Sequence, residues 1–122
     1  MKRVLLVEDH GSFRRALAMF LERKTDLKVV GEAGSVAEGL RLAREGARFD
    51  VAVIDLGLPD GDGVVLIREL RRHQPDASIL VLSVSLERDH LARAREAGAN
   101  EVLGKEARPE KLVATVKRLA GA

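Results

Sequence analysis

Residues 51–61 read VAVIDLGLPDG, an aliphatic run that stops at an acidic residue and a turn. The first four residues show no polar alternation, which is typical of a strand covered on both faces of a parallel sheet. The run ends at Asp55, and Leu58-Pro59-Asp60-Gly61 is a turn-forming sequence. We therefore expect a buried central strand with Asp55 at its carboxyl end.

Four further apolar runs predict neighbouring strands, two strong ones at residues 4–7 and 79–82 and two weaker ones at 27–30 and 101–103. The segments between them carry apolar residues at helical spacing, in stripes over residues 13–21, 36–47, 64–70, 91–94 and 112–119. Strand and helix thus alternate five times, which requires parallel strands joined by right-handed crossovers. The fold class is α/β, with a doubly wound parallel sheet of five strands and five helices.

The residues that punctuate these elements agree with the periodicity. Ser35 and Asp62 stand where helices begin, and Pro109 suits a first helical turn. Gly46 and Gly98 stand where helices end, because glycine readily adopts the left-handed conformation that follows many last turns.

Length and composition restrict the classes of protein that fit. With 122 residues, 46% hydrophobic and 33% charged, the chain fits one folded domain over residues 1–122. The absence of cysteine excludes disulfides and thiolate chemistry. No apolar run approaches the roughly 20 residues of a membrane span and no secretory signal is present, so we expect a cytoplasmic protein without a membrane partner. Mixed charges summing to +2, with 2% aromatic residues, disfavour direct binding of nucleic acid by this domain.

Polar residues follow the apolar runs, and these are the candidate site residues. Ligands of a doubly wound sheet collect outside the carboxyl ends of its strands. Taken singly, each residue fits a solvated charge or, for Asp55, a cap of the following turn. Brought together at one edge, they indicate a functional site. They are Glu8, Asp9, Asp55, Ser83 and Lys105.

Three carboxylates at one edge repel one another unless a cation lies among them. Oxygen ligands without cysteine suit a hard ion such as Mg²⁺, which keeps coordination positions free for phosphate oxygens. Glu8 and Asp9 would hold the metal with Asp55, and the backbone carbonyl of Gly57 could reach it from the turn. Asp55 is the best-placed nucleophile toward phosphorus, because a carboxylate forms an acyl phosphate.

Lys105 and Ser83 complete the expected site. The ammonium of Lys105 would contact a further phosphoryl oxygen, and the Ser83 hydroxyl would donate to another. Ser85 remains an alternative, because it lies two residues on and points to the same side of an extended strand; the spacing to Lys105 favours Ser83. We expect His10, His73 and His90 to be surface residues without metal-ligand spacing.

The order of these residues resembles the receiver domain of two-component response regulators over essentially the whole chain. The resemblance implies a flavodoxin-like sheet with strand order 2-1-3-4-5, Mg²⁺ on the acidic pair, and transfer of a phosphoryl group to Asp55 from a partner sensor histidine kinase. It implies a switch that is not an enzyme beyond weak autophosphatase activity, in which the fourth helix, fifth strand and fifth helix repack. Residues that carry the resemblance are Glu8, Asp9, Asp55, Leu58, Pro59, Gly61, Ser83 and Lys105.

Three positions depart from the family pattern. Val102 replaces an aromatic residue that often reports activation, Glu106 replaces a common proline, and Val84 is bulkier than the usual small residue after the hydroxyl. Residues 105–110 are similar to regulators that carry a helix-turn-helix output, so a DNA-binding output domain, within a longer chain or separate, is an expected partner. Activated members of the family often form homodimers.

Two other functions stay open on the residues alone. A small phosphohydrolase with an aspartyl-phosphate intermediate would need a second carboxylate near the nucleophile, and Leu56-Gly57 supplies none. A receiver-like binding module that needs no phosphorylation is favoured by Val84 and Val102.

Overall fold

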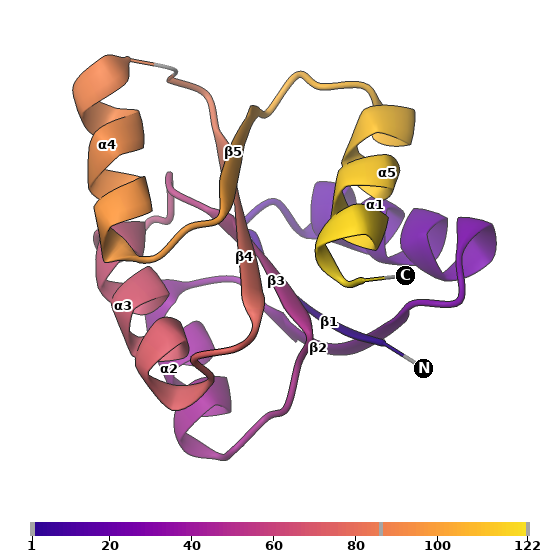
Figure 1. Cartoon of the computed structure of the whole chain (residues 1–122), viewed down its shortest axis with the longest axis horizontal. Coiled ribbons are helices and arrows are strands. Elements are labelled where there is room, and N and C mark those ends of the chain that lie inside the picture. The colour runs from indigo at the N-terminus through magenta and orange to yellow at the C-terminus, as the bar shows by residue number, and fades with distance from the viewer. Residues whose placement is uncertain (1, 86, 122) are drawn as a thin grey trace.

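A computed structural model describes residues 2–85 and 87–121, in which strands and helices alternate (Figure 1). The strands are β1 (Arg3–Val7), β2 (Lys28–Ala33), β3 (Val51–Asp55), β4 (Ser78–Ser83) and β5 (Glu101–Gly104). The helices are α1 (Gly11–Lys24), α2 (Val36–Arg44), α3 (Gly63–His73), α4 (Arg88–Ala97) and α5 (Pro109–Leu119). This alternation confirms the elements predicted from the periodicity.

The strands form one parallel sheet in the order β2-β1-β3-β4-β5, which confirms the expected topology. Strand β3 lies in the middle and pairs with β1 on one side and β4 on the other. In this register Val7 lies beside Ile54, and Asp55 lies beside Leu82. The chain segments that follow β1, β3 and β4 therefore leave the sheet at the same edge.

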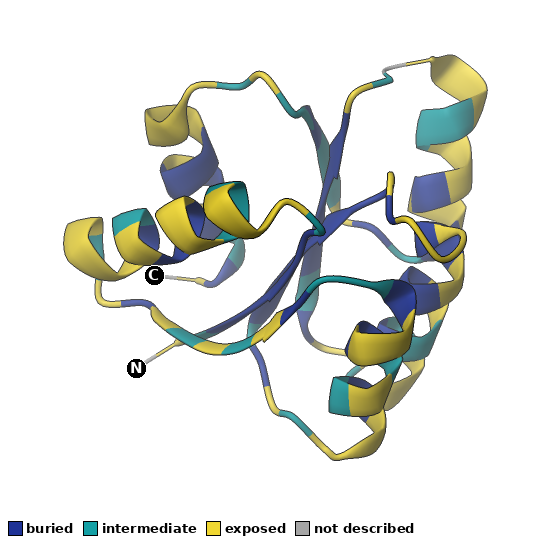
Figure 2. Ribbon diagram, turned by 180° about the vertical axis from the view of Figure 1, so that it is seen from behind, coloured by how far each residue is buried: buried dark blue, intermediate teal, exposed yellow. Residues whose placement is uncertain are grey.

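Helices cover both faces of the sheet (Figure 1). Helices α2, α3 and α4 pack on one face, where Leu5 and Ile54 point, and α1 and α5 pack on the other, where Leu6 and Val53 point. Figure 2 shows the inner strands β1, β3 and β4 buried and the outer faces of the helices exposed. Because alternate strand residues point to opposite faces, an all-aliphatic strand supplies both cores at once.

The predicted helix ends are confirmed in the structure. The Ser35 hydroxyl accepts a hydrogen bond from the Glu38 N–H at 3.1 Å. Pro109 lies in the first turn of α5, and Gly46 and Gly98 adopt φ angles of 81° and 126°. These glycines adopt the left-handed region that a Cβ disfavours.

Two boundaries differ from the prediction. Helix α2 ends at Arg44, so Ala47, which was expected on its apolar stripe, lies outside the helix. In the loop between α2 and β3 the buried apolar residue is Phe49. Strand β2 continues to Ala33, which pairs with Val7. Strand β2 lies at the edge of the sheet, and exposed residues such as Glu32 alternate with more buried ones along it. The strand therefore lacks the continuous apolar run that marks the central strands.

Asp62 gives the first testable prediction, because its carboxylate caps α3 by accepting from the Val64 N–H at 2.9 Å. This hydrogen bond holds the pKa of Asp62 below its usual range, with Arg93 of α4 contributing at 2.6 Å. Asp62→Ala should lower the free energy of unfolding at pH 7 by about 1 kcal/mol.

The pH dependence has a definite sign. A carboxyl group with a depressed pKa in the folded state contributes stability above its unfolded pKa of about 4, and loses it as pH falls through the folded value. Urea unfolding at pH 7 and below pH 4 should therefore show the difference between wild type and Asp62→Ala shrinking in acid. The exposed Asp76→Ala serves as the control. An equal difference at both pH values would contradict the capping role.

Candidate functional site at the carboxyl edge of the sheet

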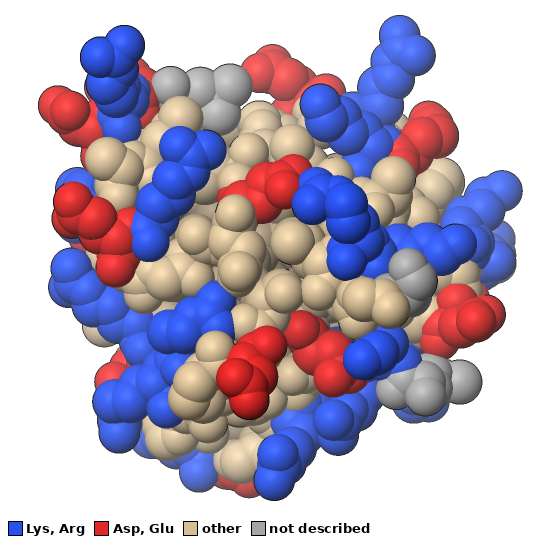
Figure 3. All heavy atoms as spheres, viewed as in Figure 1, with Lys and Arg blue, Asp and Glu red and all other residues tan. Residues whose placement is uncertain are grey.

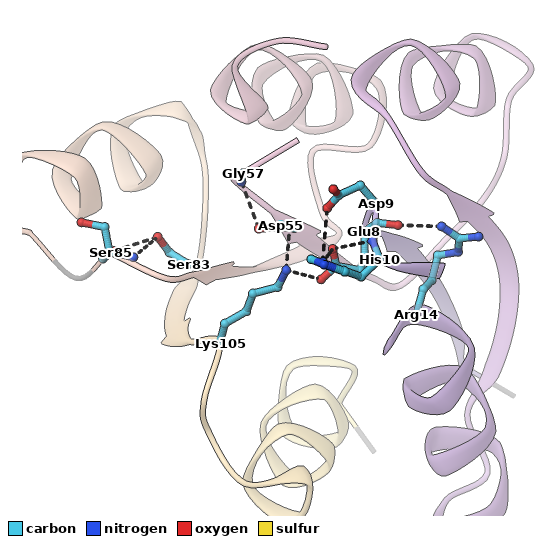
Figure 4. A network of polar contacts seen from close by, with 9 residues as sticks. All are labelled: Glu8, Asp9, His10, Arg14, Asp55, Gly57, Ser83, Ser85 and Lys105. Carbon is cyan, nitrogen blue, oxygen red and sulfur yellow. Dashed lines mark hydrogen bonds and ion pairs between the residues drawn. The ribbon is translucent and has the colours of Figure 1, made fainter. Parts of the chain in front are cut away.

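The predicted site residues lie at one edge of the sheet (Figure 4). Glu8 and Asp9 follow β1, Asp55 and Ser83 are the last residues of β3 and β4, and Lys105 follows β5. Glu8, Asp55 and Ser83 are only 3%, 3% and 2% exposed. Burial of two acidic side chains is costly unless they are paired, which indicates a function for this cluster.

Lys105 links the two buried carboxylates. Its Nζ lies 2.6 Å from Glu8 Oε1 and 3.0 Å from Asp55 Oδ2. The same ammonium lies 5.6 Å from the centre of the Phe13 ring. A lysine that follows β5 thus bridges residues that end β1 and β3, and its charge offsets part of the repulsion between them.

The pKa values follow from burial and these contacts. Burial raises the pKa of Glu8, against the effect of Lys105, while a hydrogen bond with Glu8 lowers the pKa of Asp9. Burial opposes the charged form of Lys105, yet its contacts with Glu8 and Asp55 raise its pKa overall. The ammonium contacts two carboxyl groups, Glu8 and Asp55, and Asp9 adds a third negative charge beside them, so the site attracts further positive charge.

The residues present fit a divalent cation. The buried Oε1 of Glu8 has no aligned hydrogen-bond donor, although the Lys105 ammonium touches it. Among the described residues, ligand atoms of Glu8, Asp9 and His10 lie within 4.8 Å of one another. Asp55 is joined to this group through Lys105. In this structure Glu8 and Asp55 share the Lys105 ammonium, and the sharing of a metal ion by all three carboxylates stays a prediction.

Gly57 and Ser83 occupy defined positions. The Gly57 N–H donates to Asp55 Oδ1 at 2.9 Å, which fixes the carboxylate. The Ser83 hydroxyl donates to the Ser85 carbonyl at 2.7 Å and accepts from the Ser85 N–H at 3.2 Å. Figure 4 shows this hydroxyl directed toward its own loop, away from Lys105. Ser85 lies beyond the end of β4, so Ser83 occupies the strand-end position.

Arg14 is a residue that the sequence reasoning missed. Its Nη1 donates to the Glu8 carbonyl at 2.6 Å (Figure 4). Its Nε donates to Glu32 Oε1 at 3.0 Å. The side chain from α1 thus holds the backbone of the acidic pair against the end of β2. Its position after Phe13 resembles an ordinary exposed helix residue, so periodicity alone carries no signal for this contact.

Asp60 is a second missed residue, in the loop between β3 and α3. Its carboxylate accepts from the N–H groups of Val36 and Ala37 at 2.8 and 3.1 Å. These hydrogen bonds lower the pKa of Asp60, and they attach the loop after Asp55 to the start of α2. Asp60 therefore caps a helix that precedes it in the chain, whereas Asp62 caps the helix that follows.

The three departures from the family pattern have defined environments. Val102 is partly buried and packs against the core on the α2, α3 and α4 face. Val84 is 79% exposed and, with Lys105 and Glu106, lines a hollow of about 260 Å³ beside the site. The described residues contain no cis peptide bond, which includes the bond between Lys105 and Glu106.

A comparison with family models identifies the response regulator receiver domain over residues 4–117. The chain belongs to this receiver family. It is a receiver domain of the kind found in two-component response regulators, a phosphoacceptor signalling domain. This confirms the resemblance inferred from the strand-end residues.

Relatives of this receiver domain are transcriptional regulators. It is 41% identical over 117 residues to the DNA-binding transcriptional activator DevR/DosR of Mycobacterium tuberculosis, covering 96% of this chain and 54% of the relative. The chain thus spans about half the length of the curated relatives it matches. None of the helices in the described part of the receiver has the length and hydrophobicity to span a membrane.

Solved structures share the fold. A two-component response regulator of the LuxR family from Aurantimonas sp. SI85-9A1 is 31% identical with a TM-score of 0.88, over 99% of this chain and 86% of that one. A response regulator from Burkholderia pseudomallei, 32% identical with a TM-score of 0.83 over 99% of this chain and 69% of that one, contains a phosphorylated aspartic acid and a calcium ion.

Proposed function

We propose that residues 1–122 form one receiver domain that switches when Asp55 accepts a phosphoryl group. The observation that carries the proposal is the placement of the Asp55 carboxylate. It is buried at the end of the central strand, 3.0 Å from the Lys105 ammonium and 2.9 Å from the Gly57 N–H. A carboxylate held there has one face toward the sheet edge and a positive charge beside it.

The proposed transfer assigns a role to each side chain. An Asp55 oxygen forms a bond to phosphorus while the bond to the donor's leaving group breaks, and the leaving group takes that electron pair. The Lys105 ammonium stabilises the charge on a phosphoryl oxygen. Ser83 would act after its hydroxyl leaves the Ser85 carbonyl and turns inward. We extend this to repacking of α4, β5 and α5 on phosphorylation.

Glu8 and Asp9, with Asp55 and the Gly57 carbonyl, would hold Mg²⁺. The ion would neutralise charge on the transferred phosphoryl group. Two features support this set of ligands: the buried Glu8 Oε1 has no aligned hydrogen-bond donor, and carboxyl groups are in excess at the site. Arg14 keeps the backbone of the acidic pair in place without taking up a ligand oxygen.

The proposed partners are a sensor histidine kinase and an output domain that binds DNA, in a longer chain or separate. The relatives support the output domain, since DevR/DosR is described as a DNA-binding activator and is about twice as long as the match. We also propose a cytoplasmic protein that forms a homodimer on activation, does not itself bind nucleic acid, and has at most weak autophosphatase activity.

Intact-mass spectrometry tests the function. The wild-type chain incubated with acetyl phosphate and Mg²⁺ should gain the mass of one phosphoryl group, and EDTA should prevent the gain. A chain that stays unmodified would favour the binding module that needs no phosphorylation. Multiple turnover of a phosphomonoester would favour the phosphohydrolase.

Lys105→Ala should bind Mg²⁺ more tightly than the wild type. The ammonium lies 2.6 Å from Glu8 Oε1, so it competes with a cation for this oxygen. Removing one positive charge at this distance is worth on the order of 1 kcal/mol, or about fivefold in affinity. Isothermal titration calorimetry measures the change, with the exposed Lys111→Ala on α5 as the control. Weaker binding by Lys105→Ala would contradict the competition.

A further inference from the structure

We propose that His10 contributes an imidazole ligand to the acidic site, so that the site binds first-row transition-metal ions such as Co²⁺ more tightly than Mg²⁺. The inference rests on the proposed cation site, but it does not depend on phosphoryl transfer. His10 is exposed, as expected from the sequence, and the proposal revises only the expectation that it lacks metal-ligand spacing.

The first observation is the position of the imidazole. His10 Nδ1 lies 3.9 Å from Glu8 Oε2 and 4.0 Å from Asp9 Oδ1. Two ligand atoms that each lie about 2.1 Å from one ion are at most about 4.2 Å apart. Both separations lie just inside that limit, so a rotation of the imidazole toward the carboxylates would bring the three groups to ordinary coordination distances.

The second observation concerns the buried carboxylate of Glu8. The Glu8 side chain is only 4% exposed, and its Oε1 pairs with the Lys105 ammonium at 2.6 Å, which leaves Oε2 on the side of His10. Glu8 Oε2 accepts from the backbone N–H of His10 at 3.1 Å, which fixes the loop that carries the imidazole. Glu8 Oε2, rather than the Oε1 that Lys105 contacts, is therefore the Glu8 oxygen that could share an ion with the imidazole.

The His10 imidazole is free to complete this site. Its side chain is 72% exposed, so few protein contacts resist a rotation toward the carboxylates (Figure 4). His73, by contrast, ends α3 near the opposite edge of the sheet. Figure 3 shows carboxylates interspersed among basic side chains over one face of the molecule. On this face the mixed charges would not concentrate cations broadly, so tight metal binding there would require a specific cluster of ligands.

Ligand chemistry determines the preferred ion. Mg²⁺ takes oxygen ligands and keeps much of its water, so an imidazole adds little to its binding. Imidazole nitrogen favours Co²⁺, Ni²⁺, Cu²⁺ and Zn²⁺, whose affinities exceed those of Mn²⁺ at a given site of nitrogen and oxygen ligands. His10 would thus set the metal preference of a site that otherwise contains only carboxylates and backbone oxygen.

Metal titration of the whole chain tests the proposal. Metal-free wild type, His10→Asn and the matched control His73→Asn are titrated with Co²⁺ and with Mg²⁺ by calorimetry, and the visible spectrum of Co²⁺ is recorded. His10→Asn should weaken Co²⁺ binding about tenfold and remove the spectral change of nitrogen ligation. Its Mg²⁺ affinity should stay within about twofold, which also shows that the variant is folded. His73→Asn should match the wild type with both ions.

The outcomes separate this inference from the proposed function. Equal Co²⁺ affinity and spectra in His10→Asn and wild type, or Co²⁺ binding no tighter than Mg²⁺ binding, would overturn the role of His10. If such a chain still gained a phosphoryl group with Mg²⁺, the switch would stand without the imidazole ligand. A His10-dependent Co²⁺ site in a chain that acetyl phosphate does not modify would overturn the switch alone.

Discussion

Asp55→Asn will abolish the mass gain that acetyl phosphate and Mg²⁺ produce in the wild-type chain. The carboxamide is a poor nucleophile toward phosphorus, and it removes one of the negative charges that hold a cation. Asparagine has nearly the size of aspartate, and its oxygen can still accept from the Gly57 N–H that contacts Asp55 at 2.9 Å. The loss should therefore be chemical, with the fold preserved.

Asp60→Asn is the matched control for this experiment. Asp60 lies in the same loop but is exposed, and it accepts hydrogen bonds from the start of α2. Its variant should gain one phosphoryl group as the wild type does. Phosphorylation of Asp55→Asn to the wild-type extent would place the acceptor elsewhere, and peptide mapping of the product would identify that residue.

Leu66→Ala should produce a large loss of stability. Leu66 is fully buried in the core between α2, α3 and the sheet. Its Cδ2 lies 2.7 Å from the place where a Cβ on Gly39 would be, so α2 and α3 are in close contact there. Removing the isopropyl group from such a position costs about 3 kcal/mol, through lost burial and the cavity left behind.

Val65→Ala is the adjacent control. Val65 is 47% exposed on the outer side of the same helix, so its truncation should change the free energy of unfolding by less than about 0.5 kcal/mol. Urea titration followed by circular dichroism measures both variants. Similar losses for the two would contradict the assignment of Leu66 to the core and of Val65 to the surface.

The α/β fold was predictable because burial leaves a direct trace in the sequence. A strand covered on both faces, such as residues 51–54, contains only apolar residues. In the helices between strands, apolar residues recur with a period near 3.6. Ser35 and Asp62 were also predictable as helix starts, because each hydrogen-bonds within three residues of itself. The edge strand β2 was predicted less well, since its exposed side admits Glu32.

The membership of the site was predictable from topology. Parallel strands bring their carboxyl ends to one edge, so Glu8, Asp9, Asp55 and Lys105 had to approach one another once the strand order was correct. Their chemical roles remain proposals. Arg14, Asp60 and the position of His10 were not predicted, because their partners come from other elements of the chain or depend on how a loop turns.

Local patterns in the chain therefore established which segments are strands and helices, and which polar groups end them, since these features depend on burial and hydrogen bonds between near neighbours. Tertiary packing established that Lys105 bridges Glu8 and Asp55, that Ser83 bonds to its own loop, and that the His10 imidazole lies beside the carboxylates. The Lys105 bridge joins residues 97 positions apart, from Glu8 to Lys105. The Ser83 and His10 contacts are local in sequence, but they depend on how the loops after β4 and β1 turn, which periodicity does not encode.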